Sequence, residues 1–331
     1  MTVKKPQLDQ TEIIDELPAA CGSEAAAVAF FEAKRWRGTP CCPTCGDTNV
    51  YAMKDRKTGA RNKDFRWRCR SKKCGRLFTV RTGMIFEESL VPMQKWARVL
   101  WEAGSCKNGV SALEISRKVQ VTYRTALFML NRLRHAMAYD PTPDAKLTGT
   151  VEADETYVGG KPRRPQTTYK TGKRHGKAGW NALYPKTPVF AVVQRGGNVR
   201  AQVMANVNSA NVKEALLEIA DTSARLMTDE STVYCRAGKP FASHGTTKHS
   251  SRQYVSKTDP TIHSNSVESF FARVKRQLNG TFHAVSKKHL HRYISQAAFL
   301  HNTRGLNDGE RVEALLERLK GKRLMFRAPA A

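Results

Sequence analysis

The spacing of apolar residues changes several times before residue 140, and each change predicts a different kind of element. The stretch AAAVAFFEAKRW within residues 1–35 carries apolar residues at helical spacing, which predicts an N-terminal helical lead-in. Residues 36–83 hold only short strand-like runs, such as NVYAM and FRWRC, among Cys, Gly, Arg and aromatic residues. Residues 84–140 contain little Pro or Gly and repeat apolar residues at helical spacing, so they predict a helical region.

A second pattern begins after a Pro-rich stretch at residues 139–149, which marks a boundary. From about residue 150, short β-branched runs alternate with helical patterns, and this predicts an α/β domain over residues 148–305. A basic C-terminal tail, residues 306–331, is expected after it. Residues 160–186 form a basic, Gly-containing insertion that we expect to be a mobile loop that becomes ordered on nucleic acid.

Charge narrows the choice of partner. The 331 residues include 56 Lys and Arg but only 29 Asp and Glu, for a formal net charge of +27. Neutralising phosphates and releasing their counterions is the usual use of such an excess, so nucleic acid is the expected partner. No apolar run is long enough for a transmembrane helix, and the first residues lack a signal-peptide pattern. We therefore expect a cytoplasmic protein without disulfides and without a membrane partner.

Four of the eight cysteines form two close pairs. Cys42 and Cys45 are separated by two residues, and Cys69 and Cys74 follow 23 residues later, separated by four. Two such pairs are typical of a four-thiolate zinc ribbon, and four thiolates leave no open position for catalysis. Cys41 could compete, but Cys42 leaves the correct two-residue gap. The sequence predicts a structural zinc ion here, in preference to buried cysteines or a redox pair.

Residues 109–138 have the layout of a helix-turn-helix. Ser111 is a plausible N-cap with Glu114 three residues on, which predicts a capping box and a short helix. A turn at Gln120 then leads to a second helix with Tyr123 and Arg124 at its exposed start. This arrangement is typical of a major-groove reader, and the alternative is a helical hairpin that makes no DNA contact.

Acidic residues occur in three unusual settings. Strand-like residues 150–158 place Glu152, Asp154 and Thr156 on one face, and an acid inside such a run is costly unless it is paired or bound to metal. Asp229 ends a second apolar strand, and Glu268 lies on a predicted helix.

Asp, Asp and Glu together can hold two Mg²⁺ ions for phosphodiester chemistry. Lys275 follows Glu268 by two helical turns on the same face and would touch the DNA backbone. The alternative is that these acids are unrelated helix caps and salt-bridge partners.

Long runs of the chain resemble the ISXO-like zinc-ribbon insertion-sequence transposases of the DDE superfamily. The resemblance covers residues of about 25–305 and is carried by these runs, in the family's order: CPTC…CRSKKCGRLFTVRTGMIFEES, VEADETYVGGK, LMTDES and HSNSVESFFARVKRQLNGTFHAVSKKHLHRYISQAAFLHNTR. It implies an RNase H-like catalytic fold, a mixed five-stranded sheet flanked by helices, behind the zinc ribbon and the helix-turn-helix.

The resemblance also implies site residues. Asp154 and Asp229 would be the first two ligands of two catalytic Mg²⁺ ions, with Mn²⁺ as a substitute. Asn265 and Glu268 both qualify as the third, and Glu268 is preferred because a carboxylate holds Mg²⁺ more strongly than an amide. The expected DNA contacts are Tyr123, Arg124, Lys275, Arg276, His283 and His289.

The function expected from these features is that of a bacterial, nucleoid-associated DNA transposase. It would bind terminal inverted repeats, nick the DNA and join the freed 3′-OH to target DNA, working as a homodimer or larger assembly because two element ends are handled together. One alternative is a zinc-ribbon and helix-turn-helix regulator without catalysis. A second is an RNase H-like nuclease that cuts but does not join.

Overall fold

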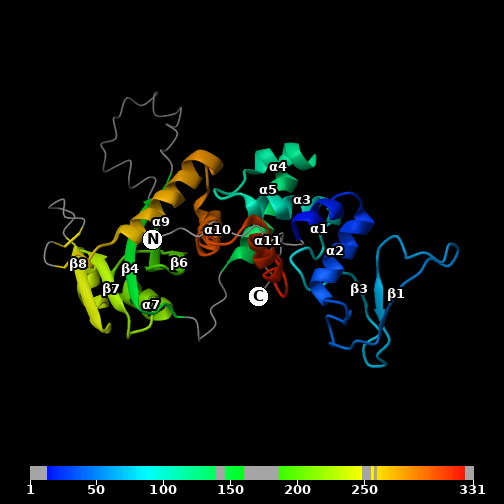
Figure 1. Cartoon of the computed structure of the whole chain (residues 1–331), viewed down its shortest axis with the longest axis horizontal. Helices are drawn as coiled ribbons and strands as arrows, with labels where there is room; N and C mark the ends of the chain where they lie inside the picture. The colour runs from blue at the N-terminus through cyan, green and yellow to red at the C-terminus, as the bar shows by residue number, and fades with distance from the viewer. Residues whose placement is uncertain (1–12, 139–145, 160–185, 248–254, 257–258, 325–331) are drawn as a thin grey trace, which may run out of the picture. The chain divides into compact units, whose positions relative to one another are not determined.

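The computed structural model describes residues 13–138, 146–159, 186–247, 255–256 and 259–324 (Figure 1). The chain divides into two compact units, one formed by residues 1–137 together with 305–331, and the other by residues 138–304. None of the helices within the described ranges is long and apolar enough to cross a membrane. The two units are called the N-terminal unit and the catalytic-type unit below.

The N-terminal unit combines helices with a small antiparallel sheet of strand order β1-β2-β3 (Figure 1). Its elements are α1 (Ile13–Ala20), α2 (Glu24–Trp36), β1 (Val50–Ala52), β2 (Trp67–Cys69), β3 (Leu77–Phe78), α3 (Met93–Ser105), α4 (Ala112–Val119), α5 (Tyr123–Met137) and α11 (Asp308–Glu317). The expected lead-in is therefore two helices, and the expected helix-turn-helix corresponds to α4 and α5.

Aromatic and ionic contacts attach α2 to the small sheet. The ring of Trp36 packs edge-to-face on Trp67 and on Phe78, at centroid distances of 5.5 and 6.1 Å. Glu32 of α2 accepts hydrogen bonds from Trp67 Nε1, at 2.7 Å, and from the guanidinium of Arg61. Each strand of this sheet is only two or three residues long, so the sheet has little core of its own. The contacts with α2 supply much of that core.

The C-terminal residues differ from the expected tail, because they begin with a packed helix. Helix α11 starts at a full capping box between Asn307 and Glu310. Its Val312 packs so closely on Gly104 of α3 that a Cβ added at Gly104 would lie 2.7 Å from Val312 Cγ2. A glycine inside a helix lowers the stability of that helix, but here the missing side chain allows the backbones of α3 and α11 to approach closely.

The catalytic-type unit is built on a mixed five-stranded sheet of order β6-β5-β4-β7-β8. The antiparallel pairs are β4–β5 and β5–β6, whereas β4–β7 and β7–β8 are parallel. Its strands are β4 (Thr150–Val158), β5 (Thr187–Gln194), β6 (Val199–Val203), β7 (Arg225–Asp229) and β8 (Ser243–Thr247). Its helices are α7 (Ser209–Ile219), α8 (Thr232–Ala237), α9 (Asn265–Arg276), the π-helical turn η4 (Gln277–Phe282), the 3₁₀ turn η5 (Lys287–His289) and α10 (Leu290–Asn302).

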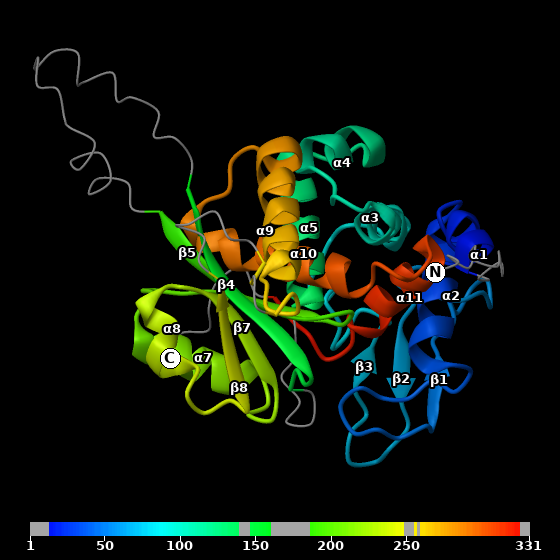
Figure 2. The same ribbon diagram turned by 60° about the vertical axis from the view of Figure 1, so that its left-hand side comes forward.

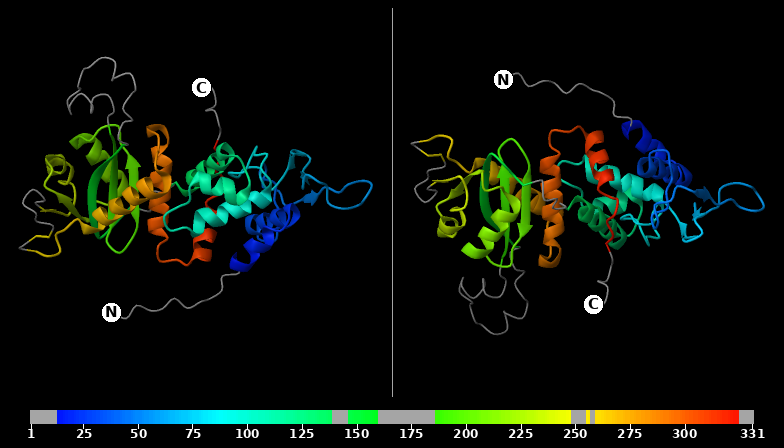
Figure 3. Two further views of the ribbon diagram at one scale, coloured as in Figure 1. Left: turned by 90° about the horizontal axis from the view of Figure 1, so that it is seen from above. Right: turned by 90° about the horizontal axis from the view of Figure 1, so that it is seen from below.

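Side-chain alternation along the strands creates two apolar layers. Val151 and Ala153 of β4 pack with α7 and α8 on one face of the sheet. On the other face, Val189 and Ala191 of β5 pack with α9 and α10. Figures 2 and 3 show α7 and α9 on opposite sides of the sheet. Each face is covered by helices because strands that alternate apolar residues on both sides must bury both.

This architecture confirms the expected fold class, an RNase H-like mixed sheet flanked by helices and preceded by a zinc ribbon and a helix-turn-helix. Residues 160–185 of the expected basic loop lie outside the described residues, so that expectation stays untested. The Pro-rich boundary at 139–149 is described only from Lys146 onward.

We expect Gly104→Ala to lower the free energy of unfolding by about 1–3 kcal/mol, because the new methyl overpacks the contact with Val312. Alanine's better helix propensity, about 1 kcal/mol, would offset only part of this loss. Urea unfolding of the purified chain measures the effect.

Two further variants make that measurement specific. Adding Val312→Ala to Gly104→Ala should restore most of the loss, because it removes the colliding methyl groups. Gly305→Ala is the matched control, since a Cβ there meets nothing within 4 Å. An unchanged unfolding midpoint for Gly104→Ala would contradict the close approach of α3 and α11.

Candidate active site

Parallel pairing of β4 and β7 places two of the expected metal ligands side by side. The register pairs Thr150 with Arg225 and Glu152 with Met227. Two residues further along both strands, the same offset brings Asp154 level with Asp229. Because side chains alternate with a period of two, both carboxylates belong to the face of the sheet that α9 covers.

Asp229 is the last residue of β7, and its carboxylate Oδ1 accepts a hydrogen bond of 3.0 Å from the backbone N–H of Ser231. Asp154 Oδ1 accepts one of 2.8 Å from the backbone N–H of Glu155. Each bond leaves carboxylate oxygens available for a cation. Asp229 thus lies at the carboxyl end of β7, the usual place for ligands in such folds, and Asp154 lies level with it in the middle of β4.

The third expected position falls on the first turn of α9. Glu268 is half-buried, and its Oε1 accepts a hydrogen bond of 3.1 Å from Ser264 Oγ. Asn265, the alternative to Glu268, is exposed at the first residue of the helix.

Asp229 and Glu268 lie close enough to Asp154 for their charges to act on its carboxyl. The pKa of Asp154 is raised from 3.8 to about 7, mainly by burial and also by the negative charges of Glu155, Asp229 and Glu268, although a hydrogen bond from the backbone of Glu155 opposes the shift. A half-buried group of like charges favours protonation or a bound cation, and perturbation of this kind is common at functional sites.

Sequence reasoning did not assign roles to Glu155 and Tyr234, two neighbours of this group. Tyr234 of α8 is fully buried, and its hydroxyl donates a hydrogen bond to Glu155 Oε2. Burial and the Glu155 charge raise the pKa of Tyr234 well above its usual value, so it remains a neutral donor. Burial likewise raises the pKa of Glu155. No local pattern in the sequence predicts this pair, because Tyr234 follows Glu155 by 79 residues and meets it only in the folded chain.

Glu152 has a different environment, although it lies on the same face of β4 as Asp154. Its side chain has 0% exposure and forms an ion pair of 2.6 Å with Arg195. The expectation that a strand acid must be paired or metal-bound is thus met at Glu152 by pairing.

Basic residues gather at the other end of α9. Arg273, Lys275 and Arg276 occupy its last turn, and the last two are exposed. Burial and the charges of Arg304 and Arg276 lower the pKa of Arg273, which reflects crowding of positive charge. Of the two expected histidine contacts, His283 is exposed and His289 is partly buried.

The four expected zinc cysteines converge in the N-terminal unit. Their sulfur atoms lie within 4.8 Å of one another, and no other group of three or more possible metal ligands is gathered this tightly in the described part of the chain. The Sγ atoms are 3.8 Å apart for Cys42 and Cys74, and 3.7 Å apart for Cys45 and Cys69. A tetrahedron with Zn–S bonds of about 2.3 Å has edges of about 3.8 Å, so the cluster fits a zinc ion.

Hydrogen bonds favour the thiolate form of one ligand, Cys42. Burial would raise the pKa of Cys42, but the N–H groups of Cys45 and Thr44 and the thiols of Cys45 and Cys74 together lower it to about 7. Glycines with positive φ, Gly46 and Gly75, directly follow two of the ligands and close the two turns.

The two helices expected for the helix-turn-helix are present as α4 and α5. Ser111 Oγ accepts a hydrogen bond of 3.1 Å from Glu114 N, whereas the Glu114 carboxylate pairs with Lys118 at 2.9 Å. The expected cap is therefore present, and Glu114 serves a different partner from the one the capping box predicts. Tyr123 and Arg124 are exposed at the start of α5, and Tyr123 retains 55% of its accessible surface.

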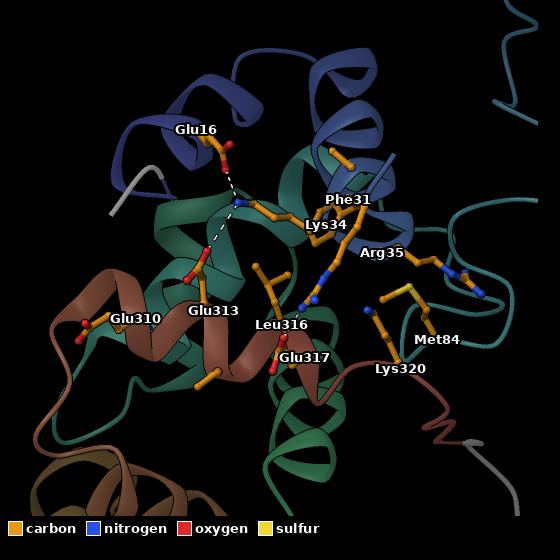
Figure 4. Close-up of a pocket in the computed structure, with 13 residues that line it drawn as sticks. Glu16, Phe31, Lys34, Arg35, Met84, Glu310, Glu313, Leu316, Glu317 and Lys320 are labelled. Atoms are coloured by element: carbon orange, nitrogen blue, oxygen red, sulfur yellow. Dashed lines mark hydrogen bonds and ion pairs between the residues drawn. The ribbon is translucent and has the colours of Figure 1, made fainter. Parts of the chain in front are cut away.

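A hollow of 620 Å³ in the N-terminal unit does not involve any of these acids (Figure 4). Two of its four cations are paired within it: Lys34 lies 2.6 Å from Glu16 and 3.6 Å from Glu313, and Arg37 lies 2.6 Å from Glu317. Acidic residues therefore neutralise part of the positive charge in this hollow.

Comparison with known proteins identifies both parts of the chain. Residues 146–302 match the ISXO2-like transposase domain, and residues 22–76 match the transposase zinc-ribbon domain, a span that includes α2. The chain is also 28% identical over 280 residues to an uncharacterized protein in the transposable element ISH50 of Halobacterium salinarum, covering 82% of this chain and 88% of that protein.

We expect Cys42→Ser to reduce bound zinc from about one ion per chain to nearly none and to unfold the ribbon, because the metal supplies its folding energy. Metal analysis of the purified protein and tryptophan fluorescence, which reports on Trp67, measure both effects. Cys41→Ser is the matched control, since Cys41 is the adjacent residue but lies outside the cluster. Equal zinc loss in both variants would contradict the assignment.

The raised pKa of Asp154 predicts a pH dependence of stability in metal-free protein. The folded state holds its proton up to about pH 7 while the unfolded state releases it near 3.8, so this group lowers stability as pH rises between those values. Asp154→Asn should therefore have a free energy of unfolding about 1–2 kcal/mol higher than wild type at pH 8 in EDTA, measured by urea unfolding. The difference should vanish near pH 4.

Asp221→Asn controls for the loss of a carboxylate. Hydrogen bonds from Ser223 lower the pKa of Asp221, so its charged form favours folding and the variant should not gain stability at pH 8. A wild type more stable than Asp154→Asn in EDTA at pH 8 would show that the acids near Asp154 do not repel it.

Proposed function

We propose that this chain, which belongs to the ISXO2-like zinc-ribbon transposases, binds the terminal inverted repeats of an insertion sequence and catalyses Mg²⁺-dependent DNA cleavage and strand transfer. The observation that carries the proposal is the group formed by Asp154, Asp229 and Glu268. These acids come from two parallel strands and a helix, and the charges of Asp229 and Glu268 add to burial in raising the pKa of Asp154.

The donor set fits Mg²⁺. Carboxylate oxygens are the ligands this hard cation prefers, and the group bears more negative charge than its half-buried surroundings favour. Asp154, Asp229 and Glu268 would hold two such ions, for which Mn²⁺ could substitute. When bound, the ions activate the attacking oxygen and stabilise the leaving oxygen of a phosphodiester displacement.

Glu268 is a better third ligand than Asn265. The Glu268 charge acts on Asp154, whereas Asn265 is exposed at the start of α9. A carboxylate also brings the charge that Mg²⁺ requires, which an amide lacks.

Other residues of the chain would bind and orient the DNA. Lys275 and Arg276 are exposed on the last turn of α9, where they can neutralise phosphates near the acids. His283 and His289 follow in the sequence, after the π-helical turn η4. Tyr123 and Arg124 at the start of α5 would contact the terminal repeat in the major groove.

A transposase of this kind would act as a homodimer or larger assembly in the cytoplasm, at the nucleoid. Two element ends must be brought together before both can be joined to one target. The same acids could in principle serve a nuclease that only cuts, and the assay below separates the two activities. A DNA-binding regulator without catalysis would leave the acid group without a role.

The test is a strand-transfer assay with a terminal-repeat duplex, target plasmid and Mg²⁺. Asp154→Asn and Asp229→Asn should each lower cleavage and joining by more than about a hundredfold, because each removes a metal ligand. Glu268→Gln should be similarly impaired while Asn265→Ala retains activity. Asp221→Asn serves as the control and should remain active, because Asp221 precedes β7 whereas Asp229 ends it.

Four outcomes would overturn parts of the proposal. Cleavage without joining supports the nuclease, and binding without cleavage supports the regulator. Full activity of Asp154→Asn and Asp229→Asn would remove the site assignment. Loss of activity in Asn265→Ala, with activity kept in Glu268→Gln, would make Asn265 the third ligand in place of Glu268.

A further inference from the structure

Glu152 is a fully buried acid for which the proposed chemistry has no use. It lies on β4 two residues before Asp154, on the same face of the sheet, and its side chain has 0% exposure. A carboxylate removed from water in this way must be compensated by donors, or it would be protonated or expelled.

Four hydrogen-bond donors surround the Glu152 carboxylate, and the ring of His263 lies beside it. Arg195 Nε lies 2.6 Å and Ser266 Oγ 3.0 Å from Oε1. The backbone N–H groups of Ser266 and Val267 donate to Oε2 at 2.6 and 3.1 Å. His263 Nδ1 lies 3.3 Å from Oε1. Apart from Arg195, all of these donors are in α9 or in the residues leading into it.

Glu152 therefore caps helix α9 from a strand more than a hundred residues away. The residue in the local cap position, Ser264, makes no capping bond with its side chain, because its Oγ donates to Glu268 instead. The Glu152 carboxylate takes over the free N–H groups of the first turn, where an anion is also favoured by the helix dipole.

Arg195, the residue directly after β5, fixes the same region. Its Nε binds Glu152, while Nη1 donates to the carbonyl of Thr261 at 2.6 Å and Nη2 to the carbonyl of His263 at 2.8 Å. One planar guanidinium thus holds both the carboxylate and the backbone that enters α9. A lysine could keep the charge but not this three-way geometry.

We propose that Glu152 and Arg195 are positioning residues that set the separation of Asp154 and Glu268. The proposal rests on the function proposed above for those two acids. Asp154 is two residues from Glu152 along β4, and Glu268 directly follows Val267, whose N–H the same carboxylate holds. A single carboxylate therefore links the two elements that carry metal ligands, and loosening it would spread those ligands apart.

The test compares Glu152→Gln, Arg195→Met and Arg195→Lys with wild type. Glu218→Gln is the matched control, because it makes the same substitution at an exposed position of α7. The first readout needs neither metal nor activity: hydrogen–deuterium exchange of the amides of residues 264–268 in EDTA. The second is the Mg²⁺ concentration that gives half-maximal cleavage of a terminal-repeat duplex, measured beside the affinity for that duplex.

In Glu152→Gln, we expect exchange at residues 264–268 to accelerate roughly tenfold while exchange in β5 stays the same. The half-maximal Mg²⁺ concentration should rise roughly tenfold or more, with duplex affinity changed less than about twofold. Arg195→Met should show the same pattern, and Arg195→Lys should recover part of it by restoring the charge. Glu218→Gln should match wild type.

The outcomes separate this proposal from the function on which it rests. Wild-type exchange at residues 264–268 and a wild-type Mg²⁺ requirement in Glu152→Gln would overturn the positioning role and leave the transposase proposal intact. If duplex affinity and activity fall equally, and exchange accelerates uniformly across the catalytic-type unit, the role of Glu152 is purely structural. If wild type lacks cleavage, the proposed function fails and exchange alone decides whether the pair holds α9.

Should Glu152→Gln fail to fold, the Arg195 variants carry the same test. They keep the Glu152 carboxylate as acceptor for Ser266 and Val267 but remove the guanidinium that holds this carboxylate and the backbone entering α9. Accelerated exchange confined to residues 259–268 in Arg195→Met, with partial recovery in Arg195→Lys, supports the proposal. Unchanged exchange in both variants overturns it.

Discussion

The parallel pairing of β4 with β7 is the constraint on which the candidate site depends. It sets Asp154 beside Asp229 by register alone, and the alternation of a strand then points both to the face covered by α9. A shift of one residue would turn Asp154 into the opposite apolar layer, among the residues that pack on α7 and α8. The alternation of apolar residues along β4 therefore fixes the strand register, and with it the face on which its acids lie.

Two acids on one face of β4 meet opposite environments. Glu152 is surrounded by donors and needs no ion, whereas negative neighbours act on Asp154 and raise its pKa. The difference arises within two residues, because the start of α9 lies over Glu152 and the carboxyl end of β7 lies beside Asp154. In this way the strand separates a structural carboxylate from one whose charge favours a cation.

Local signals in the sequence were enough to predict an α/β domain, the cysteine cluster and the Ser111 cap, whereas the RNase H-like fold was implied by the resemblance of long runs to the family. Cysteine spacing, period-two alternation and Ser111 act over a few residues, so each can be recognised without the fold. The partners of buried groups could not be predicted in the same way. Arg195 follows Glu152 by 43 residues, and Gly104 meets Val312 only after the whole catalytic-type unit has intervened. Such contacts depend on tertiary packing, which leaves no periodic trace.

Helix α11 has a consequence for how the chain is made. The N-terminal unit is interrupted at residue 137 and completed by residues after 304, where Val312, Leu315 and Leu316 enter its core. On the ribosome, the sheet that carries the acids can fold before the zinc-bearing unit has all its residues, since synthesis proceeds toward the C-terminus. Premature termination after residue 304 would therefore damage the unit made first and spare the one made second.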